Sequence, residues 1–88
     1  MILARVVGNV VATRKHATFE SFKMMLVRPV DPAGADSGPE MMAADGVGAG
    51  PGEIVLVVVE GRSAGQALHR AEAPLDAAIV GIVDRIDV

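Results

Sequence analysis

The sequence predicts a mainly β protein in which five short strands close into a small barrel, with one short helix. Five short segments are rich in apolar residues, as strands are: the first alternates in character, and the fourth and the last are rich in β-branched residues. Stretches that are polar or contain Gly, Pro, Asp and Ser separate these segments, and only one segment is predicted to form a helix. At 88 residues the chain has the length of one domain, so we assign residues 1–88 to a single domain.

The first predicted strand covers residues 2–13, and its two faces differ. The apolar face carries Ile2, Ala4, Val6, Val10 and Ala12, and the mixed face carries Leu3, Arg5, Val7, Asn9 and Thr13. Gly8 lies among the apolar positions in mid-strand, which suggests a bend or a β-bulge of the kind found at barrel corners. Residues 14–22 are polar and are expected to form a turn region.

Three further strands are expected at residues 23–30, 41–45 and 53–60, where apolar residues gather, and the last of the three is rich in β-branched residues. Residues 31–40 hold Pro, Gly, Asp and Ser and are predicted to form a loop. Residues 61–70 are predicted to form the short helix. Ser63 can cap it, and Ala64, Ala67 and Leu68 follow at helical spacing.

The last segment, residues 77–88, fits two patterns. A helical stripe is formed by Ile79, Ile82, Val83 and Ile86. The β-branched content and Gly81 favour a strand instead, and we predict a strand. The complete set of five strands and one short helix matches an OB-like barrel.

The segment DGVGAGPGEIVLVVVEG, residues 45–61, has glycine at four alternate positions: Gly46, Gly48, Gly50 and Gly52. The dinucleotide motif G-x-G-x-x-G fails, because its third glycine position falls on Pro51 or Glu53. The P-loop motif fails as well, since Gly52 precedes Glu53 rather than a lysine, and a β-branched run follows where both motifs need a helix. We therefore predict a tight turn that enters a strand, with glycine supplying positive φ or close backbone approach.

The composition excludes several classes of site. The chain has no cysteine, so it has neither disulfides nor thiolate metal ligands. The two histidines, His16 and His69, are far apart without a ligand pattern nearby, and we expect no metal and no cofactor. The N-terminus lacks the basic region of a signal peptide, and no apolar run approaches the length of a membrane span, so a cytoplasmic protein without membrane contact is expected.

The chain also has more apolar surface than one small core needs. Hydrophobic residues make up 51% of the sequence and aromatic residues only 2%, which indicates an aliphatic surplus that a neighbouring subunit covers. Oligomerisation is the remaining support for a chain of this size without disulfides or metal.

Two other function classes fit the sequence less well. An OB-type module for single-stranded nucleic acid needs aromatic platforms and a basic groove. This chain has only Phe19 and Phe22, both in one polar segment, and a net charge of −3, so we expect no nucleic-acid binding and retain this reading only as the alternative. For an enzyme, the titratable residues form no recognised constellation, and no catalytic activity is expected; the candidates were Glu53, Asp76, Asp84, Asp87 and the histidines.

Three motifs in a fixed order carry a family resemblance: LARVVGNVVATRKH at residues 3–16, DGVGAGPGE at residues 45–53 and APLDAAIVGIVDRI at residues 73–86. Together they resemble the EutN/CcmL family, the vertex proteins of bacterial microcompartments and carboxysomes, over nearly the whole chain. The resemblance implies an OB-like barrel that assembles as a closed pentameric ring with a narrow central opening. It also implies that the ring caps the five-fold corners of a polyhedral shell whose facets are hexameric proteins, and that no catalysis is involved.

The resemblance gives the glycine loop a role at the level of a hypothesis. We expect Gly48, Ala49, Gly50, Gly52 and Glu53 to lie at the subunit interface or near the central opening, where a neighbouring backbone approaches. A turn confined to one subunit is the alternative. Contacts with neighbouring shell proteins are assigned as candidates to Arg14, Lys15 and Arg70, against the simpler reading of solvated charge. Ser21 and Gly65 depart from the family pattern, which commonly has glycine and arginine there.

Overall fold

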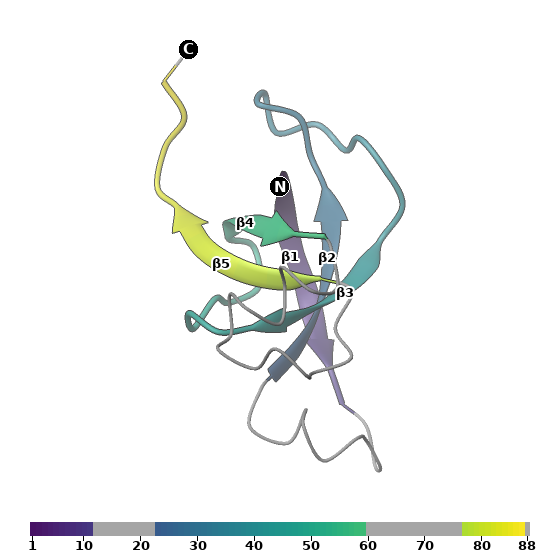
Figure 1. Cartoon of the computed structure of the whole chain (residues 1–88). Coiled ribbons are helices and arrows are strands. Elements are labelled where there is room, and N and C mark those ends of the chain that lie inside the picture. Colours follow the sequence, from purple (N-terminus) through teal and green to yellow (C-terminus); the bar gives the residue numbers. More distant parts are fainter. Residues whose placement is uncertain (12–22, 60–76, 88) are drawn as a thin grey trace.

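The computed structural model describes residues 1–11, 23–59 and 77–87, and these form a closed five-stranded barrel (Figure 1). The strands are β1 (Ile2–Val10), β2 (Lys23–Pro29), β3 (Met41–Asp45), β4 (Ile54–Val58) and β5 (Ala78–Val83). Their order around the barrel is β1-β2-β3-β5-β4. The predicted number of strands and the barrel are confirmed, and the strand at residues 41–45 has the predicted bounds.

The barrel is antiparallel except at one seam. β1 pairs antiparallel with β2 and β4, β2 with β3, and β4 with β5. β3 and β5 run parallel and share only two residue pairs, Ala44 with Ala78 and Asp45 with Ile79. The barrel therefore closes through its shortest ladder, which is reinforced by a hydrogen bond from the Ala44 N–H to the Ala77 carbonyl.

The predicted irregularity at Gly8 is a β-bulge. The β1–β2 register shifts between Val6 and Gly8, so that Val7 is the extra residue. Val6 pairs with buried Val27, whereas Gly8 pairs with Leu26, the residue between two buried neighbours. The bulge thus moves Gly8 and the rest of β1 to the other face of the strand.

Because of this shift, the predicted apolar face of residues 2–13 is wrong beyond Val6. Ala4 and Val6 are buried as expected, but Val10 pairs with Met24 on the outer side of β2. A period of two is preserved along a strand only while every residue has a partner, and one extra residue reverses the sides that follow.

Several predicted strands extend beyond the strands in the structure. β2 ends at Pro29, and Val30 forms only an isolated bridge with Asp36. β4 covers 54–58 rather than 53–60, and β5 covers 78–83 rather than 77–88. The choice of strand over helix for the last segment is confirmed. The predicted helix at residues 61–70 and the turn at residues 14–22 lie outside the described residues.

Small and medium aliphatic side chains fill the barrel. The largest fully buried side chains come from β1, β2, β4 and β5 and are Val6, Met25, Val27, Val55, Val57 and Ile79. β3 contributes the smaller buried residues Ala43 and Ala44. Ala4 and Ala43 join the same cluster. A barrel of few strands has a narrow interior, so alternation of small and larger residues is what lets it fill without voids.

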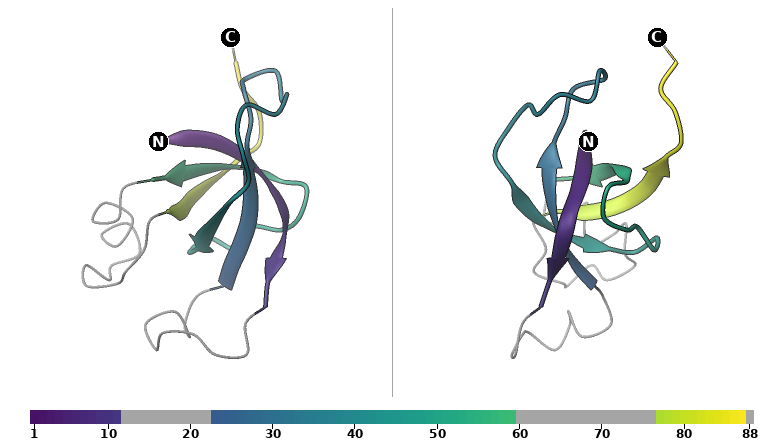
Figure 2. Two further views of the ribbon diagram at one scale, coloured as in Figure 1. Left: turned by 90° about the vertical axis from the view of Figure 1, so that its right-hand side faces the viewer. Right: turned by 180° about the vertical axis from the view of Figure 1, so that it is seen from behind.

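Loops leave the barrel on different sides. The connection through residues 30–40 and the C-terminal residues 84–87 extend from the same end of the barrel, as both views of Figure 2 show. The connection from β3 to β4, residues 46–53, folds back against β1. In the described part of the chain, no helix is long and apolar enough to cross a membrane.

Candidate functional site

The glycine loop begins with a buried carboxylate. Asp45 ends β3 and is only 7% exposed. Its Oδ1 accepts hydrogen bonds from the Val47 N–H at 2.9 Å and the Gly48 N–H at 3.1 Å. Aspartate forms such turns with the backbone two and three residues ahead, so Asp45 fixes the direction in which the chain leaves β3.

The loop returns to the barrel through positive-φ glycines. Gly48 has φ of 81° and Gly52 has φ of 89°, values that L side chains rarely adopt. The Gly52 N–H donates to the Val6 carbonyl at 2.8 Å, and the Val6 N–H donates to the Glu53 carbonyl at 2.9 Å. The predicted positive φ is confirmed at these two glycines, and the loop docks on β1 immediately before the bulge.

Gly50 and Glu53 close a small ring within the loop. The Gly50 N–H donates to Glu53 Oε1 at 2.6 Å, and the Glu53 N–H donates to the Gly50 carbonyl at 3.2 Å. Gly50 does not have positive φ, and a Cβ there would lie 3.5 Å from Glu53 Oε1, an ordinary contact. Three N–H groups of this loop therefore already bind the chain's own carboxylates, which is consistent with the absence of a phosphate motif.

Within the subunit, space is not what requires glycine in this loop. A Cβ on Gly48 or Gly52 would meet nothing within 4 Å. Ala49 between them is only 2% exposed and belongs to the hydrophobic core. Ala49 therefore anchors the loop to the barrel, while Gly48, Gly52 and Glu53 lie on its exposed side.

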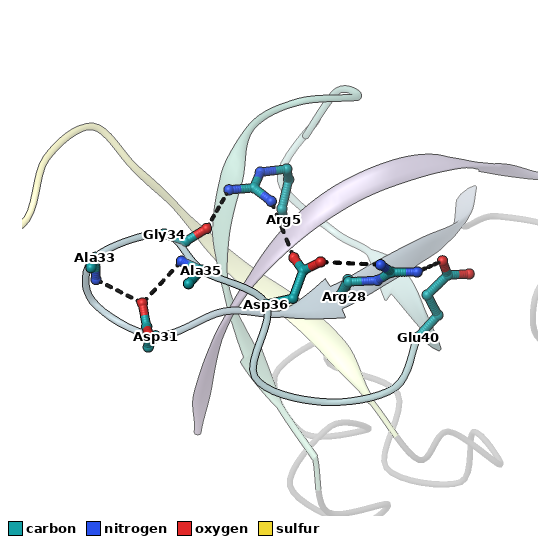
Figure 3. A network of polar contacts seen from close by, with 8 residues as sticks. All are labelled: Arg5, Arg28, Asp31, Ala33, Gly34, Ala35, Asp36 and Glu40. Carbon is teal, nitrogen blue, oxygen red and sulfur yellow. Dashed lines mark hydrogen bonds and ion pairs between the residues drawn. The ribbon is translucent and has the colours of Figure 1, made fainter.

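A second loop, residues 31–40, is held by charged side chains from two strands (Figure 3). Arg5 on β1 donates through Nη2 to the Gly34 carbonyl at 2.7 Å and lies 3.5 Å from Asp36 Oδ1 through Nη1. Arg28 on β2 pairs through Nη1 with Asp36 Oδ2 at 3.1 Å and through Nη2 with Glu40. Asp36 bridges the two arginines, so the network ties the loop to the outer side of β1 and β2.

The same loop has its own backbone turn. Asp31 Oδ1 accepts from the Ala33 N–H at 2.9 Å and the Ala35 N–H at 3.0 Å, as drawn in Figure 3. The Ser37 N–H donates to the Pro29 carbonyl at 2.8 Å. The turn and the network together shape residues 31–40, which the sequence predicts only as a loop.

Electrostatics favour the charged form of Arg28. Its hydrogen bond to Asp36, then its hydrogen bond to Glu40 and the charge of Glu40, raise the pKa of Arg28 above its ordinary value. The Arg28 side chain is partly exposed, whereas its Nε is covered and has no hydrogen-bond partner among the described residues. The pairing holds the guanidinium in one orientation across β2.

The remaining candidate residues divide into two groups. Asp84 and Asp87 are exposed on the segment after β5, and Asp87 lies 3.4 Å from the Arg85 Nε. Residues outside the described part are His16, His69, Phe19, Phe22, Asp76, Arg14, Lys15, Arg70, Ser21 and Gly65. Among the described residues, no group of three or more His, Asp or Glu side chains could hold a metal ion.

Comparisons with known proteins identify the family. The family model described as "Ethanolamine utilisation protein EutN/carboxysome" matches residues 1–84. The bacterial microcompartment shell vertex protein EutN of Escherichia coli K12 is 41% identical over 86 residues, covering 98% of this chain and 90% of that protein. The carboxysome shell vertex protein CcmL of Gloeobacter violaceus is 38% identical over 88 residues, covering 100% of this chain and 87% of that protein.

A solved structure agrees with the sequence comparisons. The GrpN pentameric microcompartment shell protein from Rhodospirillum rubrum superposes with a TM-score of 0.88 at 38% identity, covering 100% of this chain and 99% of that chain. The similarity thus extends over almost the whole length of both chains. The chain belongs to the EutN/CcmL family.

Proposed function

We propose that this protein is a structural shell protein that forms a pentamer and caps the five-fold vertices of a bacterial microcompartment. The observation that carries the proposal is the similarity to shell vertex proteins, which extends over 98% or more of this chain and includes a pentameric structure. Its place is accordingly the microcompartment shell within the cytoplasm.

The geometry of a closed shell gives such a pentamer its task. A flat sheet of hexagonal units closes into a polyhedron only where pentagons are introduced. A small barrel whose copies join head to tail forms a closed ring when the rotation between copies closes. Its partners at the vertex are the hexameric proteins of the surrounding facets.

A purely structural role agrees with the described surface. The candidate site consists of backbone turns, and its carboxylates are engaged by backbone N–H groups or by arginines of the same chain. The named relatives are structural shell vertex proteins, and this agrees with a structural rather than a catalytic role. No observation favours the oligonucleotide-binding alternative.

The glycine loop supplies the proposed contact near the ring axis. We assign Gly48, Gly50, Gly52 and Glu53 to a surface that a neighbouring subunit approaches, with Ala49 as the anchor of the loop in the core. The open space beside Gly48 and Gly52 supports this assignment, since a neighbour can approach their backbone closely.

Reconstitution of a shell tests the function. The cognate hexameric shell proteins are co-expressed with and without this chain, with no other pentamer present, and the particles are examined by electron microscopy. We expect closed particles only when the chain is present, and open or elongated shells without it. Equally closed, cargo-tight particles in its absence would contradict the vertex role.

A further inference from the structure

Two arginines lie opposite each other on the outer side of the barrel. Arg5 on β1 and Arg28 on β2 are direct cross-strand partners. Each follows or precedes a buried residue of its own strand, so both side chains point away from the core. Like charges at directly opposed positions destabilise the pairing of two strands. The β1–β2 ladder therefore contains a repulsive pair that needs a counter-charge.

The counter-charge comes from the loop between β2 and β3. Asp36 divides its carboxylate oxygens between the arginines, with Oδ1 3.5 Å from Arg5 Nη1 and Oδ2 3.1 Å from Arg28 Nη1. Glu40 pairs with Nη2 of Arg28, and the Gly34 carbonyl accepts from Nη2 of Arg5 (Figure 3). Two carboxylates thus balance two guanidinium groups, and both carboxylates belong to this loop.

The loop has few other attachments. None of residues 31–40 is buried, so burial of apolar side chains does not hold the loop in place. Its backbone contacts with β2 and the residue after it are the Ser37 N–H, which donates to the Pro29 carbonyl, and the bridge between Val30 and Asp36. The charged side chains therefore carry much of the docking.

The β1–β2 ladder is weak at the same end. β2 ends at Pro29, which pairs with Ala4 but has no N–H to donate to the ladder. The following residue, Val30, donates its N–H to the Leu3 carbonyl at 3.0 Å. The opposed arginines come directly before the proline, so this end of the ladder combines a like-charge pair with a missing donor.

We propose that loop 31–40 is an electrostatic latch on the β1–β2 ladder. While it is docked, its two carboxylates hold the opposed arginines together. When that negative charge is lost, the loop and this end of the ladder open as one unit. Segments that open locally have few buried apolar contacts and exposed hydrogen bonds, as this loop does. The latch lies within one subunit, so it goes beyond the proposed vertex role and does not depend on it.

Removal of the negative charge of the loop tests the latch. The variant with both Asp36→Asn and Glu40→Gln, which we call the latch variant, keeps the size of both side chains but leaves the arginines without a counter-charge. We expect the Ser37 and Val30 amides to exchange hydrogen about fivefold faster by NMR. The Ala44 amide, which donates across the β3–β5 seam, should keep its wild-type rate.

The two amides report on different parts of the latch. Ser37 reports on the docked loop, and Val30 reports on the end of the ladder. Faster exchange at Ser37 with an unchanged rate at Val30 would mean that the loop detaches without the ladder, and would overturn the proposal. Unchanged exchange at both amides would overturn it as well, because the carboxylates would then hold neither part.

A third substitution tests the repulsion between the arginines. In the wild type, Arg28→Met removes the ion pairs with Asp36 and Glu40 and should lower the melting temperature. In the latch variant, the same substitution removes one of two opposed like charges and should raise the melting temperature. All variants are compared at one protein concentration. A lower melting temperature in both backgrounds would show that the arginines do not repel each other, and would contradict the latch.

The matched control changes the net charge elsewhere. The variant with Asp84→Asn and Asp87→Asn removes two carboxylates from the exposed segment after β5 and should leave exchange at Ser37 and Val30 unchanged. Acceleration equal to that of the latch variant would assign the effect to net charge and overturn the proposal. Native mass spectrometry of the wild type separates this proposal from the vertex role: absence of a ring would contradict the proposed function alone, whereas the exchange rates decide the latch.

Discussion

The two loops that flank β3 are shaped by different forces. Residues 31–40, between β2 and β3, are tied to the barrel by arginine side chains on β1 and β2. Residues 46–53, between β3 and β4, are tied by backbone hydrogen bonds, a buried aspartate and two positive-φ glycines. The first loop is held by several charged groups at once. The second loop depends on single residues, a buried acceptor and glycines with positive φ.

This difference predicts unequal sensitivity to substitution. Ion pairs between partly exposed side chains contribute little each, because water screens them and competes for their hydrogen bonds. A buried acceptor or a positive-φ position has no such substitute. Changes in the glycine loop should therefore cost more free energy of unfolding than changes in the charged loop, when all variants are compared at one protein concentration.

The largest effect is expected at Asp45. Asp45→Ala removes the acceptor of two backbone N–H groups and should lower the free energy of unfolding by about 1.5–3 kcal/mol, measured by urea denaturation. Asp45→Asn keeps an oxygen in the same place and serves as the control; it should retain more than half of the lost stability. Equal losses in the two variants would mean that the charge rather than the turn matters.

The next effect compares two glycines two residues apart. Gly52→Ala forces a side chain into φ of 89° and should cost about 1–2 kcal/mol. Gly50→Ala, at a position without positive φ and with only an ordinary contact to Glu53, should leave stability unchanged or raise it by up to about 1 kcal/mol. Thermal melts of both variants, followed by circular dichroism, check this. Similar losses at both positions would indicate crowding of the whole loop instead of a conformational requirement at Gly52.

A smaller effect is expected in the charged loop. Arg5→Lys keeps the charge but loses the fork that reaches both the Gly34 carbonyl and Asp36, and should cost less than about 1 kcal/mol. The difference from the wild type should shrink further at high salt, because these groups are partly exposed. If Arg5→Lys cost more than Asp45→Ala in the same urea titration, the ranking of the two loops would be wrong.

The smallest effect concerns alkaline pH. The pKa of Arg28 is raised above its ordinary value in the folded protein, so its stabilising contribution is fully present below the unfolded-state pKa and is lost only as pH rises through the folded-state pKa. The stability difference between the wild type and Arg28→Met should therefore stay constant from about pH 7 to about pH 10. Parallel urea titrations across that interval measure it. A difference that declines steadily in this interval would assign the contribution to another group.

The contrast between the two loops also explains which features of the fold the sequence predicted. The strands follow from local sequence, and the apolar strand at residues 41–45, which lies between a loop and the glycine segment, was placed with the correct bounds. Positive φ in the glycine loop also follows from local sequence. The local sequence does not predict which glycines adopt positive φ, because all four occupy alternate positions. Gly48 and Gly52 are distinguished from Gly50 only by the docking of the loop on Val6 and by the acceptors Asp45 and Glu53.

The charged loop could not be predicted in the same way. Arg5 meets Gly34 and Asp36 from 29 and 31 positions away, and nothing in residues 31–40 alone indicates that partner. The reversed faces of β1 beyond Val6 have a related origin. Gly8 indicated a bulge, but the residue that leaves the ladder, Val7, is fixed by pairing with β2 rather than by the sequence of β1.

Native mass spectrometry of the purified protein at micromolar concentration tests the central claim, that this chain is a ring-forming vertex protein. The account predicts one dominant species of five chains, each of 9.0 kDa. A stable, folded monomer as the dominant species would contradict the account, because a single subunit cannot close a five-fold vertex.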